Sequence, residues 1–412
     1  MEGTSPAKTT LPSCPDRDWI RRVIAMLQGD GRRSADTHLV NPLFPGLKGI
    51  SIYLKDESTH PTGSLKHRLA RSLFLYGICN GRIREGTTLV EASSGSTAIS
   101  EAYFAKLLGL PFIAVVPEQT SRQKIEAIER FGGRCHFVSA PDEVYQAAVA
   151  LAQQAGGYYL DQFTYAERAT DWRGNNNIAE SIFNQMGSEA HPVPRWVIMS
   201  AGTGGTAATI GRYIRYRNFD TGLCVVDVEH SAFFDAYRSG DRQSHCCIGS
   251  RIEGVGRPRV EPSFVPEVID CMIKIPDAAS IAAMRVLSDR LFRRVGGSTG
   301  TNFFALCWVA ANMIATGEEG SLVSLICDSG ERYTATYYND AWLQSNNMEI
   351  ESYCSMLRDF LDSGRFFNMG KPRANLTKAS SLAGQTEDER APNYRAPRHH
   401  AWPSLAESPA AG

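Results

Sequence analysis

Apolar residues recur along most of this chain at two alternating spacings. Short apolar runs such as Pro111–Val116 indicate buried strands, while longer segments such as Ser94–Leu108 carry apolar residues at the three- and four-residue spacing of a helix. Glycines follow several of these helical segments, as is common at helix ends. Strands that alternate with helices of this length predict β-α-β units and mainly parallel sheets, so we expect an α/β fold.

The predicted elements run from the N-terminal region to residue 327. Strands are expected at Ile50–Glu57, Thr87–Glu91, Pro111–Val116, Arg134–Val138, Arg195–Ser200, Leu223–Glu229 and Leu322–Cys327. Helices are expected at Asp16–Gln28, from Leu65 to the Asn80-Gly81 pair, and at Ser94–Leu108, Gln119–Phe131, Asp142–Ala155, Arg173–Met186, Gly204–Arg217, Ala278–Val295 and Asn302–Thr316. Residues 1–14 are predicted to be a flexible N-terminus and residues 366–412, which are rich in Pro, Ser and charges, a disordered tail.

Composition narrows the classes of function. A chain of 412 residues with 43% hydrophobic content can bury a large core, and two domains are expected. Because 43 Lys and Arg nearly balance 44 Asp and Glu, nothing points to nucleic acid or to an anionic membrane. The ten cysteines and nine histidines show no metal-ligand spacing, so we expect reduced cysteines and no metal. Without a signal-peptide pattern or a bilayer-length apolar run, a soluble cytoplasmic protein is expected.

Lys66 is the first candidate for chemistry. It lies in the first turn of a predicted helix, just after a glycine-containing turn that leaves a strand. The partial positive charge of a helix N-terminus disfavours an ammonium group there, and such a lysine can act as a Schiff-base nucleophile. A lysine taken at random is far more often a surface residue, so the neighbouring loops have to decide between the two interpretations.

A glycine-rich loop follows the strand that ends at Ser200. Its glycines allow a phosphate to approach the backbone, and the helix that starts at Gly204 presents unpaired N–H groups. The loop consists of Gly202, Thr203, Gly204, Gly205 and Thr206, preceded by Ala201. The spacing Gly202-x-Gly204-x-x-Ala207 also fits a dinucleotide fingerprint, with the ribose acid supplied by Asp220, Asp227 or Glu229.

Two further loops carry hydroxyl groups between a strand and the next helix. Ser93–Thr97 offers hydroxyl and backbone N–H groups that suit a carboxylate, and Asp328–Tyr333 follows the last predicted strand. Taken alone, each of these loops is better explained as an ordinary helix cap, where serine, threonine and aspartate are favoured.

Together the loops resemble one family, the cysteine synthase and cystathionine β-synthase group of fold type II pyridoxal-phosphate enzymes. The resemblance extends from about Pro42 to Trp342. Its motifs are Thr62–Arg68, Ser93–Thr97, Asp161–Phe163, Gly202–Thr206, Glu253–Gly256 and Asp328–Tyr333. Within the group, the first two motifs look most like those of bacterial L-cysteine desulfhydrases.

The resemblance implies roles for the site residues. Lys66 would bind pyridoxal 5'-phosphate covalently and move the substrate Cα proton, and the loop from Gly202 to Thr206 would hold the cofactor phosphate. Ser329 would face the pyridine nitrogen without keeping it protonated, which makes the ring a weaker electron sink and favours β-elimination. The substrate carboxylate would be bound by Ser93, Ser94, Gly95, Thr97 and Gln162.

Two residues depart from the family pattern. By the resemblance, Ser96 would stand beside the cofactor's 3′-hydroxyl, where much of the family has asparagine, and its shorter side chain would alter the tilt of the ring. His67 stands where the family usually has aspartate. His67 could carry a proton, but a helix residue that follows the lysine should point away from the site, so a structural role is favoured. Both departures argue against an ordinary cysteine synthase.

The resemblance also implies an architecture like that of the tryptophan synthase β subunit, with two three-layer α/β domains and the cofactor in the cleft between them. The larger domain would combine residues 15–56 with residues 162–365, and residues 57–161 would form a small mobile domain. The family further implies a homodimer.

The function implied is β-elimination of L-cysteine, or of a related amino acid, to sulfide, pyruvate and ammonia by way of an α-aminoacrylate. Three alternatives stay open on the sequence alone. The first is β-replacement, in which a second nucleophile captures the aminoacrylate. The second is a nicotinamide-dependent oxidoreductase built on the Gly202 loop, which leaves Lys66 and Ser329 without roles. The third is a non-catalytic binding protein that keeps the fold.

Overall fold

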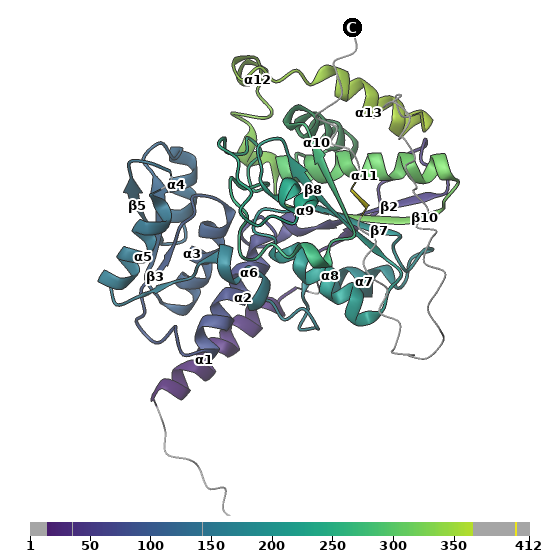
Figure 1. Cartoon of the computed structure of the whole chain (residues 1–412). Coiled ribbons are helices and arrows are strands. Elements are labelled where there is room, and N and C mark those ends of the chain that lie inside the picture. Colours follow the sequence, from purple (N-terminus) through teal and green to yellow (C-terminus); the bar gives the residue numbers. More distant parts are fainter. Residues whose placement is uncertain (1–14, 35, 142, 366–399, 402–412) are drawn as a thin grey trace, which may run out of the picture. The chain divides into compact units, whose positions relative to one another are not determined.

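The computed structural model describes residues 15–34, 36–141, 143–365 and 400–401. Contacts along the chain divide it into two compact units. The smaller combines the residues up to Thr37 with His60–Thr170, and the larger combines His38–Thr59 with the residues from Asp171 onward. Each unit contains a predominantly parallel sheet with helices packed against it, which confirms the predicted α/β class (Figure 1).

The smaller unit is built on a four-stranded parallel sheet. In spatial order its strands are β5 (Arg134–Val138), β4 (Phe112–Pro117), β3 (Leu89–Glu91) and β6 (Tyr158–Tyr159). Its helices are α1 (Pro15–Gly31), α2 (Lys66–Cys79), α3 (Ser96–Leu108), α4 (Arg122–Glu129), α5 (Val144–Gln154) and α6 (Gln162–Ala169). The carboxyl end of β3 leads through a short loop into α3, and that loop contains predicted site residues.

Helix α1 packs with the smaller unit, which differs from the predicted division of the chain. Its residues Trp19, Val23 and Leu27 are buried in the same hydrophobic core as Leu73 and Phe74 of α2. The apolar stripe of α1 was visible in the sequence. Only the packing shows which core covers this stripe. Residues 15–37 had been expected to belong to the larger unit, and they belong to the smaller one.

The larger unit is built on a seven-stranded sheet, parallel except for its first strand. In spatial order the strands are β1 (Leu39–Val40), β2 (Ile50–Asp56), β10 (Gly320–Ile326), β7 (Trp196–Ser200), β8 (Gly222–Val228), β9 (Cys271–Ile275) and β11 (His400–Ala401). Seven residues of β2 pair in register with β10, from Ile50 opposite Gly320 to Asp56 opposite Ile326. This pairing brings the first segment of the larger unit beside a strand that comes 270 residues later in the sequence.

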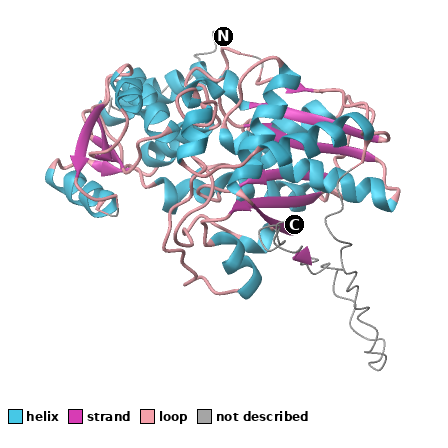
Figure 2. Cartoon of the chain, turned by 90° about the horizontal axis from the view of Figure 1, so that it is seen from above, coloured by secondary structure: helices cyan, strands magenta, loops and turns pink. Residues whose placement is uncertain are grey.

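Helices cover both faces of this sheet. α10, α11 and α13 lie on one face and α7 and α8 on the other (Figures 1 and 2). The helices of this unit are α7 (Ile178–Met186), α8 (Gly205–Arg217), α9 (Phe233–Ser239), α10 (Asp277–Leu291), α11 (Gly297–Thr316), α12 (Asp340–Ser345) and α13 (Glu351–Ser363), with short 3-10 turns at Glu57–Thr59, Pro266–Val268 and Gly330–Tyr333. Because α11 is covered by α10, α13 and the sheet, it is buried along most of its length.

Most predicted elements are present with small shifts at their ends. The helix predicted at Arg173–Met186 begins later, at Ile178, because the side chain of Asn177 caps it by accepting the N–H groups of Ala179 and Glu180. Eight α-helices and strands among the described residues were not predicted: β1, β6, β9, β11, α6, α9, α12 and α13. β9 is only five residues long, and the charged Lys274 interrupts its apolar run, so its strand pattern was weak.

The chain ends were predicted to lack structure. His400 and Ala401 of the predicted disordered tail instead pair with Cys271 and Met272 of β9. The remaining tail residues and residues 1–14 lie outside the described part of the chain. Within the described ranges every cysteine has a free thiol, and every helix is too short or too polar to span a bilayer.

Candidate active site

Lys66 is the first residue of α2, as the sequence predicted. The turn before it depends on Gly63, whose φ of 73° lies in the left-handed region that glycine adopts readily. The buried hydroxyl of Ser64 accepts the backbone N–H of Lys66 at 3.3 Å, so this side chain fixes the start of the helix. The half-buried Lys66 is thus held at a defined point of the backbone rather than on a mobile loop.

His67 points into the core of the smaller unit. Its Nδ1 lies 3.2 Å from the Thr62 hydroxyl, its Nε2 lies 3.5 Å from an Asp30 carboxylate oxygen, and its ring stacks on His60 at 4.9 Å between centroids. Burial lowers the pKa of His67 although Asp30 opposes that shift. These contacts fit the structural role expected for His67, in which it ties α1 to the turn before Lys66.

The residues expected to bind the substrate carboxylate lie where β3 passes into α3 and where α6 begins. Ser93, Ser94 and Gly95 form the loop, and Ser96 and Thr97 open α3, which no side chain of the described residues caps. The hydroxyl of Thr97 donates to the side-chain oxygen of Gln162 at 2.7 Å. The structure therefore joins two motifs that lie 65 residues apart in the sequence.

Two fully buried glutamates lie beneath this loop, and the sequence had not singled out either. Glu91 ends β3 and accepts the N–H groups of Ala92 at 2.8 Å and Gln162 at 3.1 Å. Glu101 lies one turn after Thr97 on α3 and within electrostatic range of Lys66. Burial raises the pKa of both glutamates, and more strongly that of Glu101. A carboxylate within the otherwise apolar stretch of α3 was the available sequence signal.

The predicted phosphate loop of the larger unit joins β7 to α8. Gly204 has a φ of 92°, and Thr203 accepts the N–H of Gly205 at 3.2 Å. The N-cap residue Gly204 has no side chain to cap α8, so within the described chain the first N–H groups of the helix other than that of Gly205 remain for an anion. A Cβ on Gly202 would lie 2.3 Å from the carbonyl oxygen of Gly254. The backbone is therefore packed closely enough on one side that the glycine is required.

This loop fits the phosphate of pyridoxal phosphate. The close approach of the backbone at Gly202 and Gly204, the uncapped N-terminus of α8 and the hydroxyls of Thr203 and Thr206 are the features that a dianionic phosphate requires. The dinucleotide alternative finds less support. Asp227, one of its candidate ribose acids, is fully buried and accepts the N–H of Phe234 at 2.8 Å.

Helix α11 anchors the strand ends that carry the larger unit's two site loops. The buried side chain of Asn302 accepts the N–H of Ser200 at 2.6 Å, and its amide nitrogen contacts Cys327 Sγ at 3.3 Å. The hydroxyl of Thr299 accepts the N–H of Cys327 at 3.0 Å. These anchoring roles were not predicted, since Asn302 was only the first residue of the predicted helix and Thr299 lay before it.

Replacing Asn302 with leucine is expected to destabilise the protein by about 1–3 kcal/mol. The side-chain volume stays similar, but the buried N–H of Ser200 loses its acceptor. The measurement is denaturant unfolding followed by intrinsic fluorescence. Asn312→Ala is the control on the same helix, because the amide of Asn312 contacts only the helix carbonyl of Trp308 in the described structure. Equal stability of Asn302→Leu and the wild type would show that the anchor is unimportant.

Ser329 lies at the carboxyl end of β10 and caps the short turn at Gly330–Tyr333. Its hydroxyl accepts the N–H of Glu331 at 3.4 Å and retains its own proton for donation. The preceding Asp328 is buried and accepts the hydroxyl of Tyr333 at 2.7 Å. Burial raises the pKa of Asp328 to about 6. The Asp328 carboxylate is therefore hydrogen-bonded to Tyr333. The Ser329 hydroxyl is the group at this position that can donate a hydrogen bond to a ring nitrogen.

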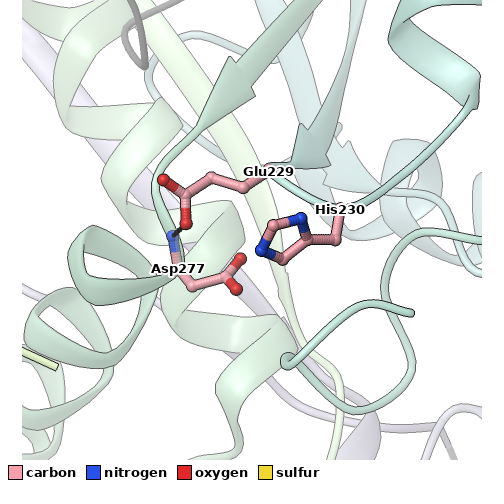
Figure 3. A group of neighbouring side chains, drawn as sticks. All are labelled: Glu229, His230 and Asp277. Carbon is pink, nitrogen blue, oxygen red and sulfur yellow. Dashed lines mark hydrogen bonds between the residues drawn. The ribbon is translucent and has the colours of Figure 1, made fainter. Parts of the chain in front are cut away.

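A further group of polar side chains lies at the ends of β8 and β9. Glu229, His230 and Asp277 place their ligand atoms within 4.8 Å of one another (Figure 3). However, Arg251 already contacts both acids, at 2.8 Å from Asp277 and 3.5 Å from Glu229. Glu229 also accepts the N–H of Asp277 at the start of α10. The guanidinium supplies the charge that a cation would bring, so we assign this cluster no metal.

The predicted site residues fall into two groups. Lys66 belongs to the smaller unit together with the carboxylate loop, Ser96 and Gln162. The glycine-rich loop and Ser329 belong to the larger unit, where α11 secures the strand ends that precede them. Each group is thus assembled by the packing of its own unit.

Comparisons with known proteins give the chain its family. Residues 36–328 match the family model described as pyridoxal-phosphate dependent enzyme. L-cysteine desulfhydrase Cds1 of Mycobacterium tuberculosis is 58% identical over 85% of this chain and 96% of its own length. A cysteine synthase of Dictyostelium discoideum is 26% identical over 75% of this chain and 83% of its own length.

Solved structures show the same fold. O-ureido-L-serine synthase is 24% identical, with a TM-score of 0.65 over 77% of this chain and 98% of that one. A hydrogen sulfide-producing enzyme, solved with an alpha-aminoacrylate intermediate, is 23% identical, with a TM-score of 0.64 over 75% of this chain and 91% of that one. The expected fold type II architecture and the expected cofactor are confirmed. The chain belongs to the pyridoxal-phosphate dependent enzyme family.

Proposed function

We propose that this protein is a pyridoxal-phosphate dependent L-cysteine desulfhydrase, which converts L-cysteine and water to sulfide, pyruvate and ammonia. The observation that carries the proposal is the 58% identity to the Mycobacterium tuberculosis desulfhydrase over 96% of that enzyme. The residues of both units support it, because they supply an anchoring lysine, a phosphate loop, a carboxylate loop and a neutral partner for the ring nitrogen.

In the proposed reaction, different residues of the chain hold the cofactor, remove the proton and bind the substrate. Bound pyridoxal phosphate supplies an electron sink that acidifies the substrate Cα–H bond. Lys66 would hold the cofactor and then, with its amine released, remove the Cα proton. The hydroxyls of Ser93, Ser94 and Thr97 and the side chain of Gln162 would orient the substrate through its carboxylate. The departing thiolate takes the electron pair of the broken Cβ–S bond and leaves as sulfide.

Ser329 favours this outcome over reactions that need a strongly electron-withdrawing ring. A serine hydroxyl can donate a hydrogen bond to a pyridine nitrogen but does not carry a charge that would keep the nitrogen protonated. The electron demand on the ring is then modest, which suits expulsion of a good leaving group such as thiolate.

The test is to incubate the purified holoenzyme with L-cysteine alone and to measure sulfide and pyruvate. Equal amounts of both products are expected. The competing proposal is a β-replacement enzyme, which is motivated by the cysteine synthase among the relatives. Sulfide release that requires an added second thiol, without pyruvate, would support replacement and overturn the desulfhydrase proposal.

The oligomeric state, the cellular location and the binding partners of the protein stay predictions. We propose a homodimer in the cytoplasm that binds an amino acid and neither nucleic acid nor membrane. Support for the amino-acid substrate comes from the relatives. The molar mass of the purified protein in solution, measured by light scattering, tests the dimer.

A further inference from the structure

The smaller unit contains a pair of buried carboxyl groups for which the proposed chemistry has no role. Glu91 at the end of β3 and Glu101 on α3 are both 0% exposed. Two carboxylates in contact inside a protein lose their hydration and repel each other, so such a pair retains a proton unless donors surround it.

The hydrogen bonds show which residue keeps that proton. Glu91 accepts N–H groups from Ala92 and Gln162, and both bonds stabilise its ionised form. No N–H or O–H group among the described residues donates to either oxygen of Glu101. The polar neighbour of Glu101 is the Glu91 carboxyl, and two carboxyl groups can hydrogen-bond only when one is protonated. Glu101 is therefore the donor and Glu91 the acceptor.

We propose that Glu101 is a positioning residue that stays protonated at neutral pH and, by donating to Glu91, holds Gln162 and the Ser93–Thr97 loop ready for the substrate carboxylate. A chain of hydrogen bonds connects Glu91 to the loop. Glu91 holds the backbone of Gln162, and the side chain of Gln162 receives the Thr97 hydroxyl at 2.7 Å. This inference rests on the proposed function, because it assumes that the loop binds a substrate carboxylate.

The proton on Glu101 also affects the electrostatic environment of the Ser93–Thr97 loop. If Glu101 ionised, it would place an additional negative charge beneath a loop that has to bind an anion. Two charged groups act on the pair: Asp161 disfavours ionisation of Glu91, whereas Lys66 favours ionisation of Glu101. Burial outweighs Lys66 and raises the pKa of Glu101 well above its usual range. The neutral carboxyl thus leaves the loop's N–H groups and hydroxyls available to the substrate.

Two substitutions separate positioning from packing. Glu101→Gln keeps a hydrogen-bond donor toward Glu91, so it is expected to keep KM for L-cysteine within about twofold of the wild type. Glu101→Leu fills similar space without a donor, so its KM should rise about tenfold with little change in kcat, as expected for the loss of one hydrogen bond to a charged group. A residue that only packed would show the reverse order, because leucine suits an apolar core better than glutamine does.

A spectroscopic measurement tests the proton independently of activity. The infrared spectrum of the holoenzyme at neutral pH should contain a protonated-carboxyl C=O band that disappears in Glu101→Gln and persists in Asp227→Asn. Asp227 is the matched control, a fully buried carboxyl in the larger unit. A spectrum without a band that depends on Glu101 would overturn the proposal whatever the enzyme's reaction.

Failure of the desulfhydrase function can be distinguished from failure of this inference. If L-cysteine is not turned over, the affinity for L-serine, followed through the absorbance of the bound cofactor, replaces KM as the readout. The same order, with Glu101→Gln close to the wild type and Glu101→Leu weaker, supports the positioning role. Equal affinities in all three proteins would contradict it.

The pair also predicts a pH dependence of stability. Burial raises the pKa of Glu101 well above its ordinary value of 4.5, so above pH 4.5 the folded state keeps a proton that the unfolded chain releases. Stability should therefore fall as pH rises above this value. The apparent melting temperature of Glu101→Gln should fall less, because the amide cannot ionise and its N–H stabilises ionised Glu91. An equal fall in both proteins would argue against the shared proton.

Discussion

Replacing Lys66 with alanine is expected to abolish sulfide and pyruvate release from L-cysteine, with a loss of at least about 10³-fold in kcat. The substitution removes both the amine that anchors the cofactor and the base that takes the Cα proton. The absorbance of the lysine-bound cofactor should disappear at the same time. Because the backbone N–H of residue 66 still reaches Ser64 at the start of α2, the fold should persist, which circular dichroism checks.

Two further variants make this result specific. Lys66→Arg keeps the positive charge, but a guanidinium stays protonated and cannot serve as the amine, so it should be as inactive as alanine. Lys106→Ala removes an exposed lysine from the last turn of α3 and should leave activity unchanged. Substantial turnover by Lys66→Ala would show that the catalytic amine lies elsewhere in the chain.

Replacing Gly202 with alanine is expected to weaken pyridoxal phosphate binding by about 10–100-fold. The added Cβ would lie 2.3 Å from the carbonyl oxygen of Gly254, so the two backbone segments must separate. That shift misplaces the N–H groups of the phosphate loop, and one or two lost hydrogen bonds to a charged group account for the expected change. The measurement is titration of the apoprotein with pyridoxal phosphate, followed by absorbance.

The matched control for this prediction is Gly249→Ala in the same unit. Gly249 has open space around the position of an added Cβ, and it lies outside the predicted site. Its cofactor affinity should equal that of the wild type. Unchanged affinity in Gly202→Ala would mean that the loop does not hold the phosphate.

Local patterns in the sequence were sufficient to predict the fold class. Alternating strand and helix periods gave the parallel α/β architecture, and glycines such as Gly109 and Gly317 end their helices in the left-handed conformation. These features depend on residues close together in the chain. For the same reason the sequence placed Lys66 at the start of α2 and the Gly202 loop between a strand and a helix.

Long-range packing was less predictable. The apolar face of α1 was visible, but the sequence could not show that Trp19 packs in the smaller unit rather than the larger one. The pairing of β2 with β10 joins segments that lie 270 residues apart in numbering. No local pattern encodes such a pairing, because either strand could satisfy its hydrogen bonds with another neighbour.

The site shows the same division. The sequence by itself determined the residue types that the chemistry requires: a lysine, a phosphate loop, a carboxylate loop and a serine at the end of a strand. Only the tertiary structure showed that Gln162 meets Thr97, that Asn302 holds the end of β7, and that Glu101 is buried against Glu91. Burial and the supply of hydrogen-bond donors are set by residues distant in sequence, so the protonation of a carboxyl such as Glu101 follows from packing rather than from the local pattern around it.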